Sequence, residues 1–271
     1  MRYDGRIMRA IVNLYKPQGM TPLQALHVLR DMKPEYRKEK MTYAGRLDPM
    51  AEGVLVVLVG DAIREKDQYC GLAKTYTADV IFGLETDTHD LLGMPARRSV
   101  SVISDERLQS EVSGLCGAHK YPFPIYSSKP VRGKPLFQWA REGKLHEVDI
   151  PTRVMDVQGM QVLERYSVTT GMLWKMIQEK IGRVSGDFRQ QEIFDQWNAL
   201  LNEKGGAFQG VRVVVQCASG TYIRTIAHEL GKRIGTGTVV VRLVRTQVGA
   251  YTVEESMGID NIYIFGHTIK Q

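Results

Sequence analysis

Residues 42–60, TYAGRLDPMAEGVLVVLVG, join a short turn-rich loop to an uninterrupted apolar run. Asp48 lies in the loop between Gly45 and Pro49, and the apolar run extends from Val54 to Val59. A continuous apolar run of this length, bounded by glycine, is typical of a strand that is buried on both faces. The stretch therefore predicts a carboxylate held on a short, stiff loop at the entrance to a buried strand.

Two interpretations of Asp48 are open at this point. Asp followed by Pro is a common way to begin a helix, with Asp as the N-cap and Pro at the first helical position. Alternatively, a loop that is fixed at both ends presents the carboxylate to a substrate with little freedom to swing away. The two interpretations are compatible, so the rest of the chain must decide between them.

The composition is that of an ordinary globular protein, with 43% hydrophobic and 24% charged residues among 271. We expect one domain over residues 1–271, because the chain is long enough to bury a substantial core and about eighteen residues after the last strand are too few for a further domain. The formal net charge of +6 suits a polyanionic partner.

The cysteines and the apolar stretches bear on location. Cys70, Cys116 and Cys217 are odd in number and far apart, which argues against a disulfide framework or a zinc site and favours a reducing cytosol. No apolar stretch reaches the roughly 18 residues that span a bilayer. Residues 1–10 lack the apolar core of a signal peptide. We therefore expect a cytoplasmic protein that does not contact a membrane.

Strands and helices are mixed along the chain. From Glu164 to Ala207, two stretches with helical periodicity predict a helical pair that is inserted between two strands and dispensable for chemistry. The other expected strands are 10–15, 76–82, 150–163, 211–218 and a closing pair within 239–253, and the other expected helices are 22–32 with Thr21 as its cap, 104–116, and one following Gly220.

The segment 120–144 differs in kind and is called the basic segment below. It holds six Lys or Arg against one Glu, together with five aromatic residues and four prolines. The prolines predict an irregular surface segment that becomes helical from about Leu136. Cations interleaved with aromatics favour contact with a phosphate backbone and exposed bases over a merely solvated loop.

The loop ETDTHD raises the possibility of a metal site, since it contains Glu85, Asp87, His89 and Asp90. These residues fall on alternating sides of a strand end, and no further ligands occur at the spacing of known metal motifs, so a polar loop is the better interpretation. The stretch KPQGMT lacks the spacing of a P-loop, and no nucleophile elbow occurs.

The stretch CASGTYIRTIAHELG contains a plausible partner for Asp48. If strand geometry persists beyond Gly220, Tyr222 and Arg224 point the same way because they are two residues apart. An Arg near a strand end can pair with an isolated carboxylate, and a neighbouring Tyr offers a flat ring or a phenolic proton. The alternative is a surface Arg at a strand-to-helix junction.

Five stretches in this order resemble the TruB-type tRNA pseudouridine synthases. They are KPQGMT at 16–21, LDPMAEGVL at 47–55, KTYTADVIFGLETDTHD at 74–90, YSSK followed by AREG within the basic segment, and SGTYIRTIAHELG at 219–231. The resemblance covers roughly residues 10–253 apart from the helical pair. It implies an α+β pseudouridine synthase fold with a mixed, mainly antiparallel sheet and a central cleft flanked by helices and loops.

The resemblance also implies roles for individual residues. Asp48 matches the aspartate that acts at C1′ of the target uridine, by attack or by removal of the C2′ proton. Tyr76 matches the tyrosine that stacks on the base and is placed for proton transfer at C5, and Arg224 matches the arginine that pairs with the aspartate. Tyr222 and Leu243 match positions that line the pocket.

Further expectations follow from the same resemblance. Lys16 belongs to a motif that supports the active-site loop, and Lys129 and Arg141 belong to the clamp on RNA. We count all three among the substrate-binding residues, together with Tyr43, which stands where the family has a histidine in the space vacated by the flipped base. The expected substrate is the uridine at position 55 in the T-arm of tRNA, modified by a monomer without cofactor, metal or C-terminal PUA domain.

Two other functions are possible from the sequence. One is an RluA-like pseudouridine synthase that acts on another RNA, since RLD before a small-residue turn also occurs in that group. The other is a catalytically idle chaperone that only assists tRNA folding. The presence of Asp48, Tyr76 and Arg224 argues against the second.

Overall fold

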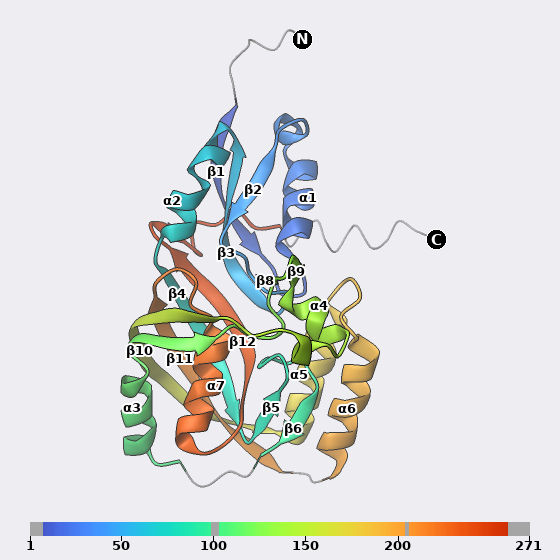
Figure 1. Ribbon diagram of the computed structural model, residues 1–271, viewed down its shortest axis with the longest axis vertical. Coiled ribbons are helices and arrows are strands. Elements are labelled where there is room, and N and C mark those ends of the chain that lie inside the picture. Colours follow the sequence, from blue (N-terminus) through green and yellow to red (C-terminus); the bar gives the residue numbers. More distant parts are fainter. Residues whose placement is uncertain (1–7, 99–102, 204–205, 260–271) are drawn as a thin grey trace.

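The computed structural model describes residues 8–98, 103–203 and 206–259. A curved nine-stranded sheet runs through the molecule in the order β1-β3-β12-β4-β11-β10-β7, with β2 paired to β3 and β13 paired to β12 (Figure 1). Its strands are β1 (Arg9–Lys16), β2 (Met41–Ala44), β3 (Ala51–Gly60), β4 (Lys74–Phe82), β7 (Gly117–Pro122), β10 (Thr152–Thr169), β11 (Ala207–Cys217), β12 (Thr238–Val248) and β13 (Tyr251–Thr252). Two small hairpins, β5 (Leu84–Thr86) with β6 (Pro95–Arg97) and β8 (Pro130–Val131) with β9 (Lys134–Pro135), lie outside it.

The strand pairing is mainly antiparallel, as predicted. Within the part of the chain that the structure describes, β12 and β3 are the strands of this sheet that pair in parallel, over Leu243 to Arg245 against Ala51 to Gly53. This short parallel pair joins the N-terminal strands to the rest of the sheet, and the loop carrying Asp48 enters the sheet at that junction.

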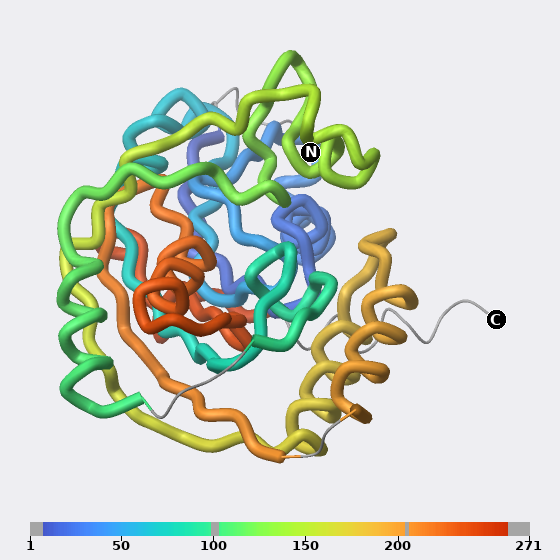
Figure 2. The backbone as a smooth tube through the Cα atoms, turned by 60° about the horizontal axis from the view of Figure 1, so that its bottom comes forward, coloured from blue at the N-terminus to red at the C-terminus, as the bar shows by residue number. Residues whose placement is uncertain are grey.

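Helices cover both faces of the central strands. They are α1 (Pro22–Met32), α2 (Lys66–Gly71), α3 (Asp105–Gly114), α4 (Leu136–Arg141), α5 (Thr170–Gly182), α6 (Gln190–Glu203) and α7 (Ile223–Ile234). On β4, Val80 packs in the cluster that contains residues of α3 and α7, whereas Ile81 packs in the cluster that contains residues of α5 and α6. Because neighbouring side chains of a strand point to opposite faces, the two clusters lie on opposite sides of the sheet. In Figure 2, α7 lies inside the curve of β10 and β11 while α5 and α6 lie side by side at its far end.

The predicted buried strand is confirmed. Every residue from Val54 to Val59 is fully buried, and odd and even positions belong to two different hydrophobic clusters. Helix α1 packs in the cluster that contains the odd positions. It begins as predicted: the Gln24 main-chain amide donates to the Thr21 hydroxyl, and the Thr21 main-chain amide donates to the Gln24 side-chain oxygen.

The structure excludes one of the two interpretations of Asp48, and two local predictions were wrong. Asp48 does not begin a helix: its carbonyl accepts from the Ala51 amide in a tight turn, and β3 starts at Ala51 because the apolar run that follows must be buried in the sheet. The helical pair begins at Thr170 rather than 164, because β10 continues along β11 to Thr169. The first residues of the basic segment, 120–122, form strand β7 against β10.

The helical pair is part of the core rather than an appendage. Trp197 of α6 is fully buried, and its indole Nε1 donates to the Leu91 carbonyl at 3.1 Å. Ile177 and Ile181 of α5 are fully buried in the cluster that also contains Ile81 of β4. Replacing the pair by a short hairpin would therefore uncover one face of the sheet.

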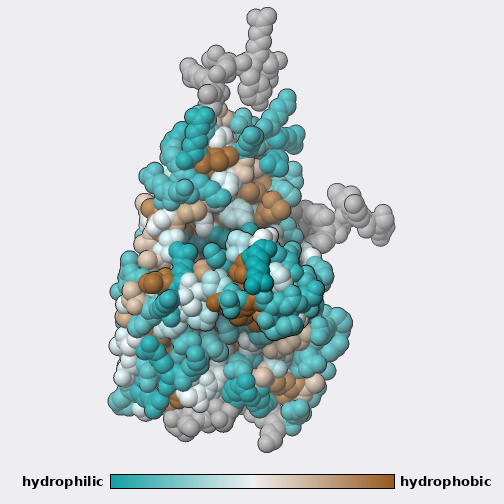
Figure 3. All heavy atoms as spheres, in the orientation of Figure 1, coloured by the Kyte–Doolittle hydropathy of each residue, from teal (hydrophilic) through white to brown (hydrophobic). Residues whose placement is uncertain are grey.

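The surface in the view of Figure 1 is mostly hydrophilic, with hydrophobic residues in small separate groups (Figure 3). No helix within the described residues is long and apolar enough to cross a membrane. Residues 1–7, which carry most of the stretch examined for a signal peptide, and residues 260–271, which carry most of the short C-terminal remainder, lie outside the described part of the chain.

Candidate active site

Asp48 and Arg224 form the centre of the candidate site. The Arg224 Nε donates to Asp48 Oδ2 at 2.8 Å, across 176 residues of sequence. The Arg224 side chain is 4% exposed and that of Asp48 is 31% exposed, so a buried cation holds a carboxylate that substrate can still reach. The pairing was predicted, but its geometry differs from the prediction: β11 ends at Cys217, and Arg224 lies in the first turn of α7 rather than on a strand end.

The other donors of Arg224 are also engaged. Nη1 donates to the Thr88 carbonyl at 2.5 Å and Nη2 to the Tyr126 carbonyl at 3.4 Å. Burial by itself lowers the pKa of Arg224, but the carboxylates of Asp48 and Asp90 outweigh this effect and the pKa is raised. Arg224 is therefore a fixed cation whose orientation is set from three directions.

Asp90, which the sequence predicted to lie in a polar loop, with a metal site as the alternative, is a further residue of the site. Its Oδ2 lies 3.7 Å from Arg224 Nε, and its side chain is 8% exposed. Burial raises the pKa of Asp90 to about 6, although Arg224 opposes the rise. The sequence signal for this contact was the spacing of Thr88 and Asp90, which are two residues apart. In the structure the Thr88 hydroxyl donates to the Asp90 carboxylate at 2.8 Å.

Two hollows meet at Asp48. The larger, about 390 Å³ and called the tyrosine hollow below, is lined by Tyr76, Tyr222 and Leu243. The smaller, about 270 Å³ and called the arginine hollow, is lined by Arg141 and other residues of the basic segment and of the turn between α5 and α6. Residues common to both hollows are Arg46, Leu47, Asp48, Ser127, Ser128 and Arg224. Together they form the central cleft that was predicted.

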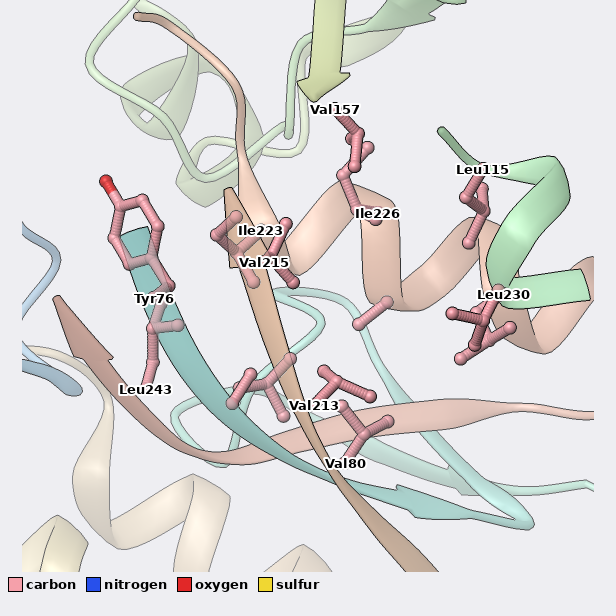
Figure 4. Packing of buried hydrophobic residues seen from close by; sticks show 14 of the residues in the cluster. Tyr76, Val80, Leu115, Val157, Val213, Val215, Ile223, Ile226, Leu230 and Leu243 are labelled. Carbon is pink, nitrogen blue, oxygen red and sulfur yellow. The ribbon is translucent and has the colours of Figure 1, made fainter. Parts of the chain in front are cut away.

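The tyrosine hollow contains the predicted pocket residues. Tyr76 of β4 and Leu243 of β12 lie next to each other at one end of the buried cluster, and the Tyr76 hydroxyl points away from the aliphatic side chains (Figure 4). Burial raises the pKa of Tyr76, and the positive charge of Arg245 opposes the rise. Tyr222 packs edge-on against Phe123 with ring centroids 5.7 Å apart. The hollow thus combines aromatic and aliphatic groups with charged side chains, among them Asp48 and Arg224.

Lys16 and Tyr43 do not lie where a substrate contact would require. Lys16 is fully buried, and its ammonium donates to the carbonyls of Pro17 and Met20 at 2.9 and 2.7 Å. It supports the chain near Asp48 and presents nothing to RNA, so its assignment as a substrate-binding residue was wrong. The Tyr43 side chain packs on the cluster of β1 and α1 and does not line either hollow, because β2 turns it toward α1.

Lys129 and Arg141 lie in the basic segment, residues of which line both hollows. The Lys129 ammonium lies 5.3 Å from the centre of the Phe123 ring and lines the tyrosine hollow. Arg141 lines the arginine hollow and pairs with Asp187 in the turn between α5 and α6 at 2.6 Å. Cations of the basic segment therefore line both hollows.

The side chains of the polar loop 85–90 that could ligate a metal have other partners in the structure. Glu85 pairs with Arg98, Asp87 pairs with Arg189, and the His89 ring stacks on His228 with centroids 4.1 Å apart. Each side chain thus has its own partner in a different direction. Among the residues that the structure describes, no group of three His, Cys, Asp or Glu is arranged to hold a metal ion.

Comparison with known proteins agrees with this geometry. The family model described as TruB family pseudouridylate synthase (N terminal domain) matches residues 33–180, more than half of the chain. The chain belongs to the TruB family of pseudouridylate synthases. It is accordingly a pseudouridine synthase, an isomerase, as the sequence predicted.

Relatives of this family match nearly the whole chain. The tRNA pseudouridine synthase B of Xanthomonas euvesicatoria pv. vesicatoria is 30% identical over 94% of this chain and 68% of its own length. The tRNA pseudouridine synthase B of Trichormus variabilis is 30% identical over 94% of this chain and 72% of its own. Among solved structures, a chain of a Cbf5-Nop10-Gar1 complex superposes with a TM-score of 0.57 at 18% identity, covering 96% of this chain and 56% of that one. The last likeness confirms the predicted fold.

Proposed function

We propose that the enzyme converts a uridine in the T-arm loop of tRNA, at position 55, to pseudouridine. Relatives that match 94% of the chain are named tRNA pseudouridine synthase B. The net charge of +6 and the cations at the cleft suit a polyanionic substrate. The observation that carries the proposal is the 2.8 Å bond between buried Arg224 and half-exposed Asp48, at the point where an aromatic hollow opens.

Asp48 supplies the negative charge that the reaction needs. Breaking the N1–C1′ bond of uridine leaves C1′ electron-poor, and the base must then turn and rejoin through C5. A carboxylate can attack C1′ or remove the C2′ proton, and both routes require its ionised form. Arg224, a buried cation, donates to one carboxylate oxygen of Asp48 and so restricts how the side chain can turn.

The tyrosine hollow receives the base. Its volume of about 390 Å³ is within the usual range for small-molecule pockets. Tyr76 and Tyr222 offer flat rings, Leu243 adds an apolar contact, and the Tyr76 hydroxyl is available for proton transfer at C5. A base inside a folded RNA loop reaches Asp48 only after it is flipped out of its stack.

The basic segment and the cations around it hold the phosphate backbone. Lys129 belongs to that segment, and Arg46 and Arg153 line the same hollow. We place the enzyme in the cytoplasm, because its substrate and its free cysteines Cys70, Cys116 and Cys217 suit a reducing compartment. We also propose that it acts as a monomer.

The decisive experiment is Asp48→Asn, which keeps the shape of the side chain and removes its charge. Pseudouridine formation at saturating tRNA should fall more than about 100-fold while tRNA affinity stays within a few-fold. Asp105→Asn is the control, since that carboxylate is 76% exposed on α3 and lines neither hollow. Activity of Asp48→Asn above a hundredth of wild type would remove Asp48 from the chemistry.

Substrate choice is tested separately. In a strain that lacks the gene, mass spectrometry of total tRNA should show unmodified uridine at position 55, and restoring the wild-type gene should restore pseudouridine. A missing pseudouridine in another RNA would favour an RluA-like function. Rescue by Asp48→Asn to the wild-type level of modification would contradict the proposed chemistry.

A further inference from the structure

Arg245 of β12 is a buried cation at the floor of the tyrosine hollow. The residue is 1% exposed, yet it lines the same hollow as Asp48 and Tyr76. Its guanidinium donates to three main-chain carbonyls: Nε to Val54 at 2.7 Å, Nη2 to Gly45 at 3.1 Å and Nη1 to Arg46 at 3.4 Å. Within the described part of the chain, no carboxylate lies within ion-pair distance of it, which is unusual for a buried charge.

The three carbonyls lie on both sides of Asp48 in the sequence. Gly45 and Arg46 precede it and Val54 follows it, so one side chain binds the start and the end of the loop that presents the carboxylate. The loop itself lies between β2 and β3, and its main chain is also held by the Gly19 amide, which donates to the Pro49 carbonyl at 2.8 Å. A planar guanidinium with several fixed donors can bridge two chain segments in a way that a single ammonium cannot.

Two glycines of the loop take conformations that fit this arrangement. Gly53 has φ +104°, and a Cβ there would lie 2.3 Å from the Arg245 carbonyl oxygen, so glycine lets β12 approach β3 closely. Gly45 has φ +79°, and a Cβ there would lie 3.5 Å from Arg245 Nη1, so glycine supplies the left-handed turn under the guanidinium. The two glycines thus allow the main chain before and after Asp48 to lie close to Arg245.

Arg245 also contacts the second group of the reaction. On the sheet Arg245 is the direct cross-strand partner of Tyr76 on β4, and both side chains line the tyrosine hollow. Its positive charge opposes the effect of burial on the pKa of that phenol. The same side chain therefore binds the chain around Asp48 and lies beside Tyr76.

We propose that Arg245 is a positioning residue of the isomerisation, which holds the Asp48 loop and the Tyr76 side chain in fixed relation to the same flipped base. The inference rests on the proposed role of Asp48. It assigns Arg245 no contact with the reacting atoms. Its effect is on the rate of the bound complex rather than on the affinity for RNA.

The test compares Arg245→Lys and Arg245→Met with wild type in steady-state assays at saturating and subsaturating tRNA, which give kcat and KM. Arg245→Lys keeps the charge but cannot bind all three carbonyls at once. A misplacement of about 1 Å can lower a rate by on the order of 10²-fold. We therefore expect kcat to fall about ten- to a hundredfold and KM to stay within threefold of wild type. The kcat of Arg245→Met should fall further, because this variant also loses the charge. The matched control is Arg165→Met, because Arg165 of β10 donates to the Ile103 carbonyl at 2.8 Å and lines neither hollow.

A pH–rate profile separates positioning from a general loss of structure. Removing the charge of Arg245 raises the pKa of Tyr76, so the alkaline limb of the profile should move to higher pH in Arg245→Met and stay in place in Arg245→Lys. If Arg245→Met does not fold, Arg245→Lys decides the question by its kcat and KM.

Three outcomes overturn the inference: an Arg245→Lys variant with wild-type kcat, a defect confined to KM, or a fall in kcat matched by Arg165→Met. If Asp48→Asn is inactive while both Arg245 variants are fully active, the inference fails and the proposed function stands. If Asp48→Asn is active, the proposed function itself fails.

Discussion

At the scale of single residues, the site depends on buried cations that bind the partly exposed Asp48 carboxylate and main-chain carbonyls around it. Arg224 directs its three donor nitrogens to Asp48, Thr88 and Tyr126. Such a cation stabilises the ionised carboxylate at the cleft, because the pair lies partly out of water where charge interactions are stronger. Precision comes from the fork shape of guanidinium as much as from its charge.

Arg224→Lys tests that distinction. Lys keeps the charge but cannot satisfy three acceptors in different directions, so kcat should fall by about 10²-fold while KM changes little. Steady-state kinetics with tRNA, together with a thermal unfolding curve to show that the variant folds, is the measurement. A variant with normal kcat and raised KM would make Arg224 an RNA-binding residue instead.

Lys16 predicts a pH dependence of stability. Burial lowers its pKa from 10.5 to about 7, although Asp48 opposes the shift. Between these values the folded protein holds Lys16 neutral and the unfolded chain binds a proton, so unfolding takes up a proton and becomes less favourable as pH rises. Relative to Lys16→Met, the free energy of unfolding of wild type should rise from pH 7 toward 10.5 by up to about 1.4 kcal/mol per pH unit.

Urea titrations of both proteins at several pH values measure this difference. Groups other than Lys16 cancel in the comparison, because they are present in both. Parallel curves for the two proteins would show that Lys16 stays charged when buried.

At the scale of elements, the helical pair α5–α6 serves the fold and the site at once. It covers one face of β4 and β12 through Trp197, Ile177 and Ile181, and its connecting turn reaches the basic segment. In that turn, Arg189 lies 4.8 Å from the Tyr126 ring and Asp187 pairs with Arg141. The pair thus fixes one wall of the arginine hollow.

Trp197→Ala should therefore be costly. Deleting a fully buried indole leaves a cavity and an unpaired Leu91 carbonyl, and such changes cost about 3–5 kcal/mol. Trp174→Ala on α5 is the control, since Trp174 is only partly buried, and its loss should be clearly smaller. Chemical denaturation of both variants gives the numbers, and equal losses would mean that α6 is not anchored through Trp197.

At the scale of the whole molecule, cations from several elements meet at the cleft. The chain carries a net charge of +6, and cations line both hollows while Asp48 is the carboxylate at their junction. Neutralising phosphates releases counterions, so binding of RNA should weaken steeply as salt rises.

The double variant Lys129→Gln with Arg141→Gln tests the contribution of the basic segment. If each cation meets a phosphate, the slope of log affinity against log salt should decrease in magnitude by about 0.7–0.9 for each one removed. The control is Arg107→Gln, because Arg107 is 55% exposed on α3 and lines neither hollow. Filter binding of tRNA between low and moderate salt is sufficient, and an unchanged slope would remove the basic segment from the RNA interface.

The sequence by itself determined the elements whose cause is local. Thr21 and Gln24 cap α1 through neighbours three residues apart, and the run Val54 to Val59 has no alternative to burial in a sheet. The motifs around Asp48, Tyr76 and Arg224 were also readable, because each is a short stretch with its own chemistry. Those residues were expected together, and the structure brings them to one cleft.

Tertiary structure decided what depends on packing between distant segments. Asp48 could have begun a helix, but the sheet required β3 to start at Ala51. Lys16 reads as an exposed cation until the fold buries it, and Asp90 reads as a loop carboxylate until Arg224 approaches within 3.7 Å. The role of Arg245 in joining both ends of the loop was equally hidden, because its partners lie some 190 to 200 positions away in the chain. Burial and hydrogen-bond partners are properties of the folded chain, and no local pattern contains them.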